Sequence, residues 1–336
     1  MKTLRAGIIG CGNIFPMHAY PLQALENVEF KAVCDIDRKR ADEMAEKFSC
    51  KAFYDYKEMI DSGEIDVVHI LTPHYLHCEM ALYALEKGLF VICEKPMAIL
   101  PEEGKAMYDA GKKSGGKLGI IFQNRYNPGS VFAKQAIESG KLGKALGGKI
   151  IVTWHRDASY YASADWRGTW DKEGGGVIIN QSIHSFDLAR WLIGKNVIGV
   201  DAHIENRIHP TIEVEDEAVG VVHFEDDVNV IFYATNNFSM DDAIEVMLHF
   251  ENGVIRIRGN KAEITYTDGT KEVSPEDTLK VNFGEGAKSC WGTSHYKQIK
   301  DTYRAFYEGG DDFWLEQAYE TFKMITMLYN SAKKGE

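Results

Sequence analysis

Short apolar runs alternate with helical patterns through residues 1–122. The apolar runs have the length of buried strands and read "RAGIIG", "EFKAVCDI", "DVVHILTP", "LFVICEKP" and "KLGIIFQ". Between them, amphipathic patterns predict helices at residues 16–24, 38–48, 75–86 and 101–114. Strands that alternate with helices in this way predict a parallel sheet covered by helices on both faces.

The pattern changes after residue 122. One helical stretch, "GSVFAKQAIESGKLGK", precedes two long strand-like segments, "EAVGVVHFEDDVNVIFYAT" and "AIEVMLHFENGVIRIRGNKAEITYTDGTKEV". The turns "ENG" and "TDG" inside the second segment predict hairpins. We therefore predict an α/β protein: a Rossmann domain with a doubly wound parallel sheet over residues 1–122, and an α/β domain with a large, mostly antiparallel open sheet over residues 123–336.

A glycine turn follows the first predicted strand. Gly10 permits a tight turn, and Gly12 lets the backbone approach a pyrophosphate at a helix N-terminus, which predicts a dinucleotide site that includes Asn13 and Ile14. The third position of this motif normally carries Gly or Ala, but here it is Phe15. That departure predicts an altered turn or a displaced helix. A plain glycine turn with no ligand is the alternative.

The second predicted strand ends at an acid, Asp35, which stands 23 residues after Gly12. An acid at this point hydrogen-bonds the adenine ribose hydroxyls and repels a 2′-phosphate, so we predict NAD as the cofactor. NADP remains the alternative, because a phosphate could be bound by three nearby basic residues, Arg38, Lys39 and Arg40.

The next strand ends in "LTPHYLH". Ligands of open parallel sheets bind at the carboxyl edge, so Thr72, Pro73 and His77 are predicted to contact the cofactor. His74 and His77 have the spacing of a metal pair, but they lack a third ligand. We expect capping or cofactor contact from them, and we expect no metal.

"EKPMAI" begins directly after the strand "LFVIC". Lys95 should therefore project toward the nicotinamide, where an ammonium stabilises a substrate oxygen that gains negative charge. Glu94 belongs to the same cofactor-contacting segment. The alternative is a surface ion pair between the two residues, which Pro96 disfavours because it fixes the chain just after Lys95.

A polar stripe interrupts the apolar segment "GGGVIINQSIHSFDLARWLIG". Asn180, His184 and Asp187 stand at i, i+4 and i+7, which predicts that they share one helix face. Leaving such groups buried and unpaired costs ~1 to 3 kcal/mol each, so they must have partners. A substrate cleft and a structural histidine–aspartate pair both satisfy this requirement. In a cleft, His184 has a pKa suited to a base, and Asp187 could orient it.

Further polar and aromatic side chains are candidates for substrate contact. "FQNRYNP" supplies Arg125 and Tyr126, and "TWHRDASYYASADWRGTW" supplies Trp166 and Arg167. Aromatic faces and forked donors suit a polyhydroxylated ring.

Composition excludes several classes of protein. The 336 residues carry a formal net charge of -12, which disfavours nucleic acids and anionic membranes as partners. No apolar run reaches the ~20 residues of a membrane span, and the N-terminus does not resemble a signal peptide. The six cysteines show no C-x-x-C spacing, so they predict neither a zinc cage nor a redox pair. We expect a cytoplasmic protein.

"GIIGCGNI", "EKP" after a strand, "WRGTW", "GGGVIINQSIHSFDLARWLIG" and "SHYKQI" together resemble the Gfo/Idh/MocA family of oxidoreductases, relatives of glucose-fructose oxidoreductase and inositol dehydrogenase. The resemblance spans the chain and implies a Rossmann domain joined to an α/β domain whose open sheet forms dimers or tetramers. It implies that Lys95 is the catalytic lysine and His184 the general acid/base. The family often has Asp where this chain has Asn180, so proton transfer is assigned to His184 and substrate hydrogen bonding to Asn180.

The resemblance implies an NAD-dependent dehydrogenase acting on a secondary hydroxyl or ketone of a sugar, glycoside, nucleotide sugar or cyclitol. Two alternatives stay open. One is a lyase or epimerase that retains its NAD and passes through a transient 3-keto sugar. The other is a non-catalytic NAD or sugar sensor, which the departures at Phe15 and Asn180 permit.

Overall fold

The computed structural model describes residues 3–279, 281, 293–309 and 314–334. The chain divides into two compact units. Unit 1 consists of Met1–Gln123 and Leu279–Tyr319, and unit 2 consists of Asn124–Thr278 and Glu320–Glu336. The predicted boundary after residue 122 lies beside the first crossing, but the prediction did not include the return of the later segment to unit 1.

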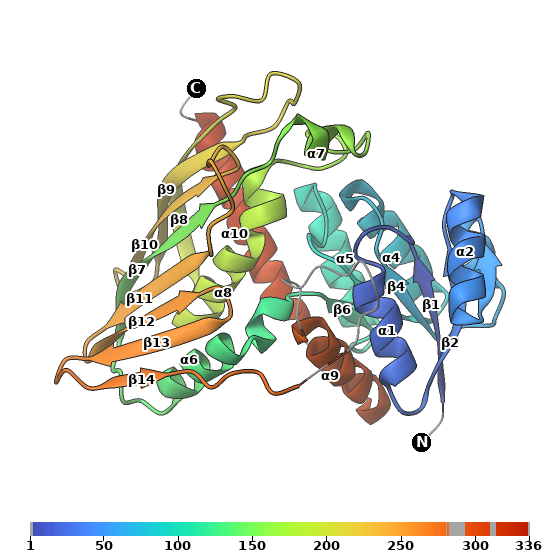
Figure 1. Cartoon of the computed structure of the whole chain (residues 1–336), viewed down its shortest axis with the longest axis horizontal. Coiled ribbons are helices and arrows are strands. Elements are labelled where there is room, and N and C mark those ends of the chain that lie inside the picture. The colour runs from blue at the N-terminus through green and yellow to red at the C-terminus, as the bar shows by residue number, and fades with distance from the viewer. Residues whose placement is uncertain (1–2, 280, 282–292, 310–313, 335–336) are drawn as a thin grey trace. The chain divides into compact units, whose positions relative to one another are not determined.

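Unit 1 contains a six-stranded parallel sheet with the order β3-β2-β1-β4-β5-β6. Its strands β2, β1, β4 and β6 are labelled in Figure 1. Its strands are β1 (Leu4–Ile9), β2 (Val28–Cys34), β3 (Lys51–Phe53), β4 (Val67–Ile70), β5 (Phe90–Cys93) and β6 (Leu118–Ile120). From β1 the chain adds β2 and β3 on one side of the sheet, and from β4 it adds β5 and β6 on the other side. The connections therefore diverge at the carboxyl ends of these two strands, which is where doubly wound sheets bind ligands. The predicted Rossmann sheet is confirmed.

Most helices of unit 1 lie between consecutive strands. They are α1 (Pro16–Ala24), α2 (Arg38–Phe48), α3 (Tyr56–Asp61), η1 (His74–Leu76), α4 (His77–Glu86) and α5 (Pro101–Lys113). The 3₁₀ helix η2 (Gln123–Tyr126) follows the last strand, at the point where the chain passes from unit 1 to unit 2. The predicted helix at 75–86 is thus a short 3₁₀ turn followed by α4. A helix from the far end of the sequence, α9 (Ser294–Glu308), packs against α1.

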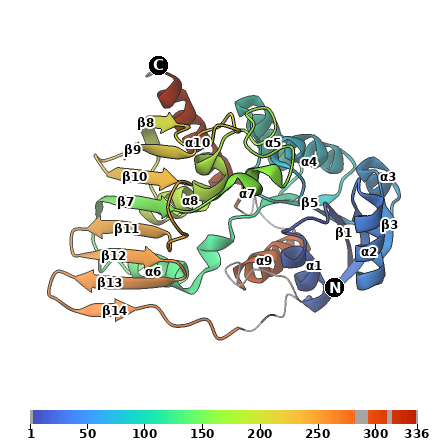
Figure 2. The same ribbon diagram turned by 45° about the horizontal axis from the view of Figure 1, so that its top comes forward.

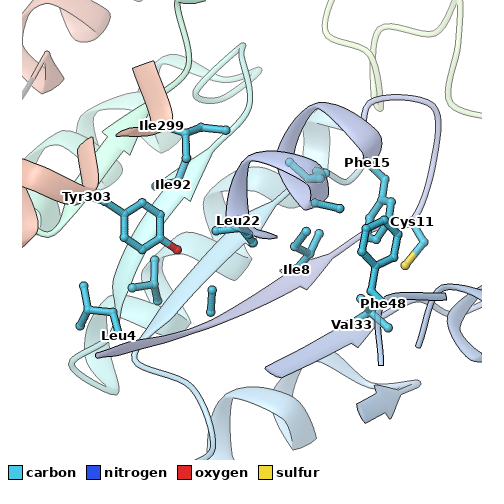
Figure 3. Close-up of a cluster of buried hydrophobic side chains, with 14 of the residues drawn as sticks. Leu4, Ile8, Cys11, Phe15, Leu22, Val33, Phe48, Ile92, Ile299 and Tyr303 are labelled. Carbon is cyan, nitrogen blue, oxygen red and sulfur yellow. The ribbon is translucent and has the colours of Figure 1, made fainter. Parts of the chain in front are cut away.

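The core of unit 1 explains the residue that departs from the glycine motif. Phe15 is 1% exposed and belongs to the core cluster of Figure 3. Its ring packs edge-on against Phe48 at 5.5 Å and lies 6.4 Å from Phe30. The Phe15 side chain therefore points into the core, where it packs against α2 and β2. Helix α1 starts at the next residue, Pro16.

Unit 2 contains an eight-stranded sheet with the order β14-β13-β12-β11-β7-β10-β9-β8 (Figure 2). Its strands are β7 (Ala145–Thr153), β8 (Val197–Glu205), β9 (Glu217–Phe224), β10 (Asn229–Thr235), β11 (Glu245–Phe250), β12 (Gly253–Arg258), β13 (Lys261–Tyr266) and β14 (Lys271–Val273). All neighbours pair antiparallel except β7 and β10, which are parallel. The predicted open, mostly antiparallel sheet is confirmed.

Two helices, α6 (Pro128–Glu138) and α8 (Ile183–Ile193), pack on one face of this sheet (Figure 1). The other helices of unit 2 are α7 (Ala158–Ala162), the π-helix η3 (Val177–Ser182) and the greater part of α10 (Leu315–Lys334). Along β10, Val230 and Phe232 are buried, whereas Ile231 between them is 54% exposed. One face of the sheet is therefore core and the other is surface. Among the residues described, no helix is both long and apolar enough to cross a membrane.

Candidate active site

The glycine turn after β1 has the space that a dinucleotide requires. Gly10 has φ +95°, and a Cβ there would lie 2.7 Å from the carbonyl oxygen of Leu71, so only glycine fits. A Cβ at Gly12 would meet no atom within 4 Å. The missing side chain of Gly12 thus leaves open space beside the turn, as close approach of a pyrophosphate requires. Asn13 and Ile14 follow in the same turn, before α1.

Asp35 lies directly after β2 and next to this turn. The carboxylate is buried and accepts hydrogen bonds from the backbone N–H groups of Cys11 and Asp37, both at 2.9 Å. The Arg40 guanidinium lies 3.3 Å from the same carboxylate. Arg40, one of the three basic residues that kept NADP as an alternative, therefore already has an anionic partner. The arrangement fits the ribose-binding acid of an NAD site.

His77 connects the loops that follow β4 and β5. Its Nε2 lies 2.9 Å from the carbonyl oxygen of Thr72, and its Nδ1 lies 2.7 Å from that of Pro96. Burial lowers the pKa of His77, while these two carbonyls act in the opposite direction. Because both ring nitrogens contact backbone, His77 holds the two loops at the predicted cofactor edge.

Glu94 and Lys95 follow β5 at the same edge of the sheet. Glu94 is 7% exposed, so it is not the surface partner of Lys95 that the sequence left as an alternative. Its carboxylate lies 3.0 Å from His18 Nε2 and 3.5 Å from His295 Nε2, and its Oε2 accepts the backbone N–H of Lys95 at 3.2 Å. Lys95 itself is half-buried.

A chain of buried aromatic groups continues from Glu94. His18 Nδ1 lies 2.8 Å from His69 Nδ1, and His69 Nε2 lies 3.0 Å from the Tyr303 hydroxyl. None of these partners of Glu94 was predicted from the sequence, because they come from α1, β4 and α9 and share no local motif.

The directions of the pKa shifts indicate how these hydrogen-bonded side chains are protonated. Burial alone would raise the pKa of Glu94, but the hydrogen bonds from His18 and His295 outweigh it and hold the pKa well below the usual range. Burial lowers the pKa of His18 and of His69 and raises that of Tyr303. Glu94 is therefore ionised, and His18 and His69 are neutral. Each hydrogen bond then donates in the direction of the carboxylate: the Tyr303 hydroxyl donates to His69 Nε2, His69 Nδ1 to His18 Nδ1, and His18 Nε2 to Glu94.

The same cluster also bears on metal binding. His18, Glu94 and His295 form the one group in the described part of the chain that offers three possible ligand atoms within 4.8 Å of one another. The hydrogen bond and ion pair that join these groups account for the arrangement, so we assign no metal.

In unit 2, the segment predicted as one helix is a π-helix, η3, followed by α8. The expectation that Asn180, His184 and Asp187 share one face through α-helical spacing is therefore wrong, because the wider turn of η3 changes the direction of Asn180. From residue 175 to 190, Asn180 and His184 are nevertheless the two residues that are not buried. These two polar side chains reach the surface from an otherwise buried segment.

Asp187 has a different role from the one expected. It forms a buried ion pair with Arg125, whose Nε lies 2.7 Å from Asp187 Oδ2, and the side chains are 2% and 1% exposed. Thr321 donates a further hydrogen bond to Asp187 at 2.6 Å. We therefore assign Arg125 and Asp187 a packing role inside unit 2 in place of the predicted substrate contact, and Asp187 uses its oxygens on these partners rather than on His184.

Asn180 belongs to a polar cluster around the Tyr160 hydroxyl. Asn180 Nδ2 lies 3.3 Å and Gln181 Nε2 3.0 Å from this hydroxyl. The Arg167 guanidinium donates to it at 2.6 Å and lies over the rings of Tyr160 and Trp166, 4.4 and 4.5 Å from their centroids. The loop that carries Trp166 and Arg167 is thus packed beside η3. Tyr126, the remaining predicted contact, is half-buried after β6.

The structure gathers the predicted residues in two groups. In unit 1 the carboxyl edge of the sheet carries Gly10, Gly12, Asn13, Ile14, Asp35, Thr72, Pro73, His77, Glu94 and Lys95. In unit 2 the polar cluster includes Asn180, Trp166 and Arg167, and His184 lies four residues after Asn180. Lys95 and His184 belong to different units, so their joint action is part of the functional proposal below.

Two family models match the chain. The model described as "Oxidoreductase family, NAD-binding Rossmann fold" matches residues 4–122. The model described as "GFO/IDH/MocA C-terminal domain" matches residues 131–256.

Similar proteins include dehydrogenases of sugars. Levoglucosan dehydrogenase of Pseudarthrobacter phenanthrenivorans is 31% identical over 270 residues, which cover 76% of this chain and 66% of that protein. D-glucoside 3-dehydrogenase of Escherichia coli is 29% identical, with 99% and 97% covered. Among solved structures, the WlbA dehydrogenase from Bordetella pertussis in complex with NADH and UDP-GlcNAcA has a TM-score of 0.88 at 26% identity, covering 100% of this chain and 97% of that one.

Proposed function

Because the chain belongs to the GFO/IDH/MocA family of NAD-binding oxidoreductases, we propose that it is a dehydrogenase that acts on a secondary hydroxyl or ketone of a sugar, sugar derivative or cyclitol. Relatives named for levoglucosan, D-glucosides and inositol support this substrate class. A relative crystallised with NADH and UDP-GlcNAcA extends it to nucleotide sugars.

The proposed cofactor is NAD, which accepts or returns the hydride when bound. Gly10 and Gly12 shape the turn that would hold the pyrophosphate, and Asp35 would hold the adenine ribose. Thr72, Pro73 and Lys95 follow the strands on the other side of the switch point, where the nicotinamide half would lie.

The observation that carries the proposal is the exposure of His184 in a buried segment. His184 is half-buried and its Nδ1 is buried, so we propose that Nε2 is the nitrogen that faces the substrate. We assign Nε2 the removal of the hydroxyl proton during oxidation and its return during reduction. Lys95 would hold the substrate oxygen and stabilise its developing negative charge. Asn180, Trp166 and Arg167 would bind the other hydroxyls or an acidic group of the substrate.

The proposal extends to location and assembly. Cys11, Cys34, Cys50, Cys78 and Cys93 are free thiols, which suits the reducing cytoplasm, and Cys290 lies outside the described residues. We place the enzyme in the cytoplasm, as a homodimer or homotetramer formed through the exposed face of the unit 2 sheet.

The test is release of NADH, followed by its near-ultraviolet absorbance, when the protein and NAD meet a panel of levoglucosan, glucosides, inositols and nucleotide sugars. One class of substrate in this panel should give steady production of NADH. Lys95→Ala should lower kcat/KM by about 10² or more, and His184→Ala should lower turnover by ~10² to 10⁴, with NAD affinity unchanged in both. Lys105→Ala, at an exposed lysine of α5 in unit 1, serves as the control.

Three results would contradict the proposal. Near-wild-type turnover of folded Lys95→Ala would remove the lysine from the chemistry. Conversion of a sugar without net NADH release would favour the lyase or epimerase alternative, and tight NAD binding with no conversion of any substrate would favour a sensor.

A further inference from the structure

The backbone on both sides of Lys95 is tied to buried groups. On one side, the Glu94 carboxylate accepts the Lys95 N–H at 3.2 Å. On the other side, the carbonyl oxygen of Pro96 lies 2.7 Å from His77 Nδ1, and the same ring reaches Thr72 through Nε2. The backbone of Lys95, at the end of β5, is therefore held by contacts on both its N-terminal and its C-terminal side.

The carboxylate that holds Lys95 is itself fixed by side chains from other elements. His18 lies on α1 and His295 on α9, and both are at most 1% exposed. His69 of β4 and Tyr303 of α9 continue the hydrogen-bonded chain behind His18. Glu94 thus connects the end of β5 to three other elements of unit 1, and a shift of this strand end would disrupt several buried hydrogen bonds.

We propose that Glu94 is a positioning residue for Lys95. It fixes the backbone at the end of β5, from which the side chain and ammonium group of Lys95 extend. This inference rests on the proposed role of Lys95 in catalysis. A lysine side chain is long and adopts many rotamers, so a mobile backbone beneath it would leave the ammonium group spread over many positions. Misplacement of a reacting group by about 1 Å can lower a rate 10²-fold.

The hydrogen bond, rather than the charge, is the feature that acts on Lys95. A glutamine at position 94 can keep this contact, because its amide oxygen can face the Lys95 N–H while its NH₂ donates to His18 Nε2. The chain of His18, His69 and Tyr303 can then reverse its direction, since each ring can exchange donor for acceptor. Glu94→Gln is therefore the conservative variant, and Glu94→Ala removes the contact.

The kinetic test compares these variants with Asp66→Ala. Asp66 accepts the N–H of Arg5 at 3.0 Å, an equivalent contact at the start of β4, at the opposite edge of the same sheet. Glu94→Ala should lower kcat about 10- to 100-fold while the Kd for NAD stays within about threefold. Glu94→Gln should recover kcat to within about fivefold of wild type, and Asp66→Ala should lower stability but leave kcat unchanged. If Glu94→Ala does not fold, Glu94→Leu fills the space without accepting a hydrogen bond.

A second readout needs no substrate. Hydrogen exchange of the Lys95 amide should be at least about tenfold faster in Glu94→Ala than in wild type and in Asp66→Ala, and near wild type in Glu94→Gln. Unchanged exchange would overturn the inference even if the wild-type protein oxidised no sugar, so the two proposals can fail separately.

Three other outcomes would also overturn it: equal loss of kcat in Glu94→Gln and Glu94→Ala, a kcat loss matched by loss of NAD binding, or a stoichiometric metal ion in the purified protein that disappears in Glu94→Ala.

Discussion

Asp35 is the residue on which the choice of cofactor depends. Its carboxylate lies beside the glycine turn and carries a negative charge that would repel the 2′-phosphate of NADP. Asp35→Ser should weaken NAD binding by about tenfold and improve the relative affinity for NADP, because a ribose hydrogen bond and the repulsion are both lost. Fluorescence titration of both cofactors checks this.

The control for that substitution is Asp37→Ser, which removes a neighbouring charge but keeps a side chain able to cap α2, since Asp37 caps this helix through the N–H of Arg40. It should leave the ratio of the two affinities nearly unchanged. A wild-type protein that binds NADP more tightly than NAD would show that Asp35 does not have the role assigned to it.

Single residues were predictable where their chemistry is local. The glycine turn and the acid at the end of β2 follow from spacing alone, and the structure places them side by side. Asp187 was not predictable, because its partner Arg125 is 62 residues away and leaves no periodic signal. The histidines around Glu94 escaped detection for the same reason.

At the scale of elements, Glu215 should make stability depend on pH. It accepts hydrogen bonds from the N–H groups of Gly176 and Ile178 and from the Tyr329 hydroxyl, so it holds the start of η3. Burial outweighs these contacts and raises the pKa of Glu215 to about 7, above its ordinary value of 4.5. Folding therefore favours the protonated carboxyl group.

The sign of the effect follows from this order of pKa values. The stabilising contribution of Glu215 is complete below about pH 4.5 and is lost as the pH rises through about 7. Across this range, the free energy of unfolding should fall by about 2 to 3 kcal/mol more in wild type than in Glu215→Gln, because glutamine stays uncharged. Urea unfolding of both proteins between pH 5 and 8 checks it, and parallel curves would contradict it.

Elements were predictable in proportion to the regularity of their side-chain pattern. Five of the six strands of the Rossmann sheet follow from apolar runs, but the three-residue strand β3 and the short helix α3 were not predicted. In unit 2, β7 was not predicted because two adjacent glycines, Gly147 and Gly148, interrupt it. The π-helix η3 could not be seen because its apolar residues also fit an α-helix. Its start is held by Glu215, 37 residues beyond Ile178.

At the scale of the whole molecule, the exposed face of the unit 2 sheet predicts self-association. Val219 and Ile231 are 48% and 54% exposed on the adjacent strands β9 and β10, beside the edge strand β8. Ile231→Lys should convert a dimer or tetramer to monomers, because it places a charge among apolar side chains that a partner would cover. Light scattering at micromolar concentration measures the mass.

The matched control is Ile36→Lys, which adds the same charge at an isoleucine of unit 1 that is 93% exposed. It should leave the mass unchanged. A wild-type protein that is monomeric under these conditions would contradict the proposed assembly.

The division of the chain was predictable only in its first half. The change from alternating strands and helices to hairpins marks the crossing after Gln123. The apolar residues of α9, such as Ile299, Tyr303 and Phe306, show a buried face but do not indicate which sheet it covers. The prediction therefore left Leu279–Tyr319 with the second domain, whereas α9, which lies in this segment, contributes to the core of the first unit.

The late arrival of α9 has a consequence for protein synthesis. Ribosomes add about 5 to 20 residues per second, so the helix is complete about 10 to 40 seconds after the last strand of the sheet it completes. During that interval the nascent Rossmann sheet lacks Ile299 and Tyr303, and Glu94 and His69 lack partners that they have in the finished protein. A fragment ending at Gln123 should accordingly show no cooperative thermal transition, whereas adding a separate peptide of residues 293–309 should restore one. Calorimetry of the fragment with and without the peptide measures this, and a cooperative transition of the fragment alone would show that the sheet matures before its last helix is made.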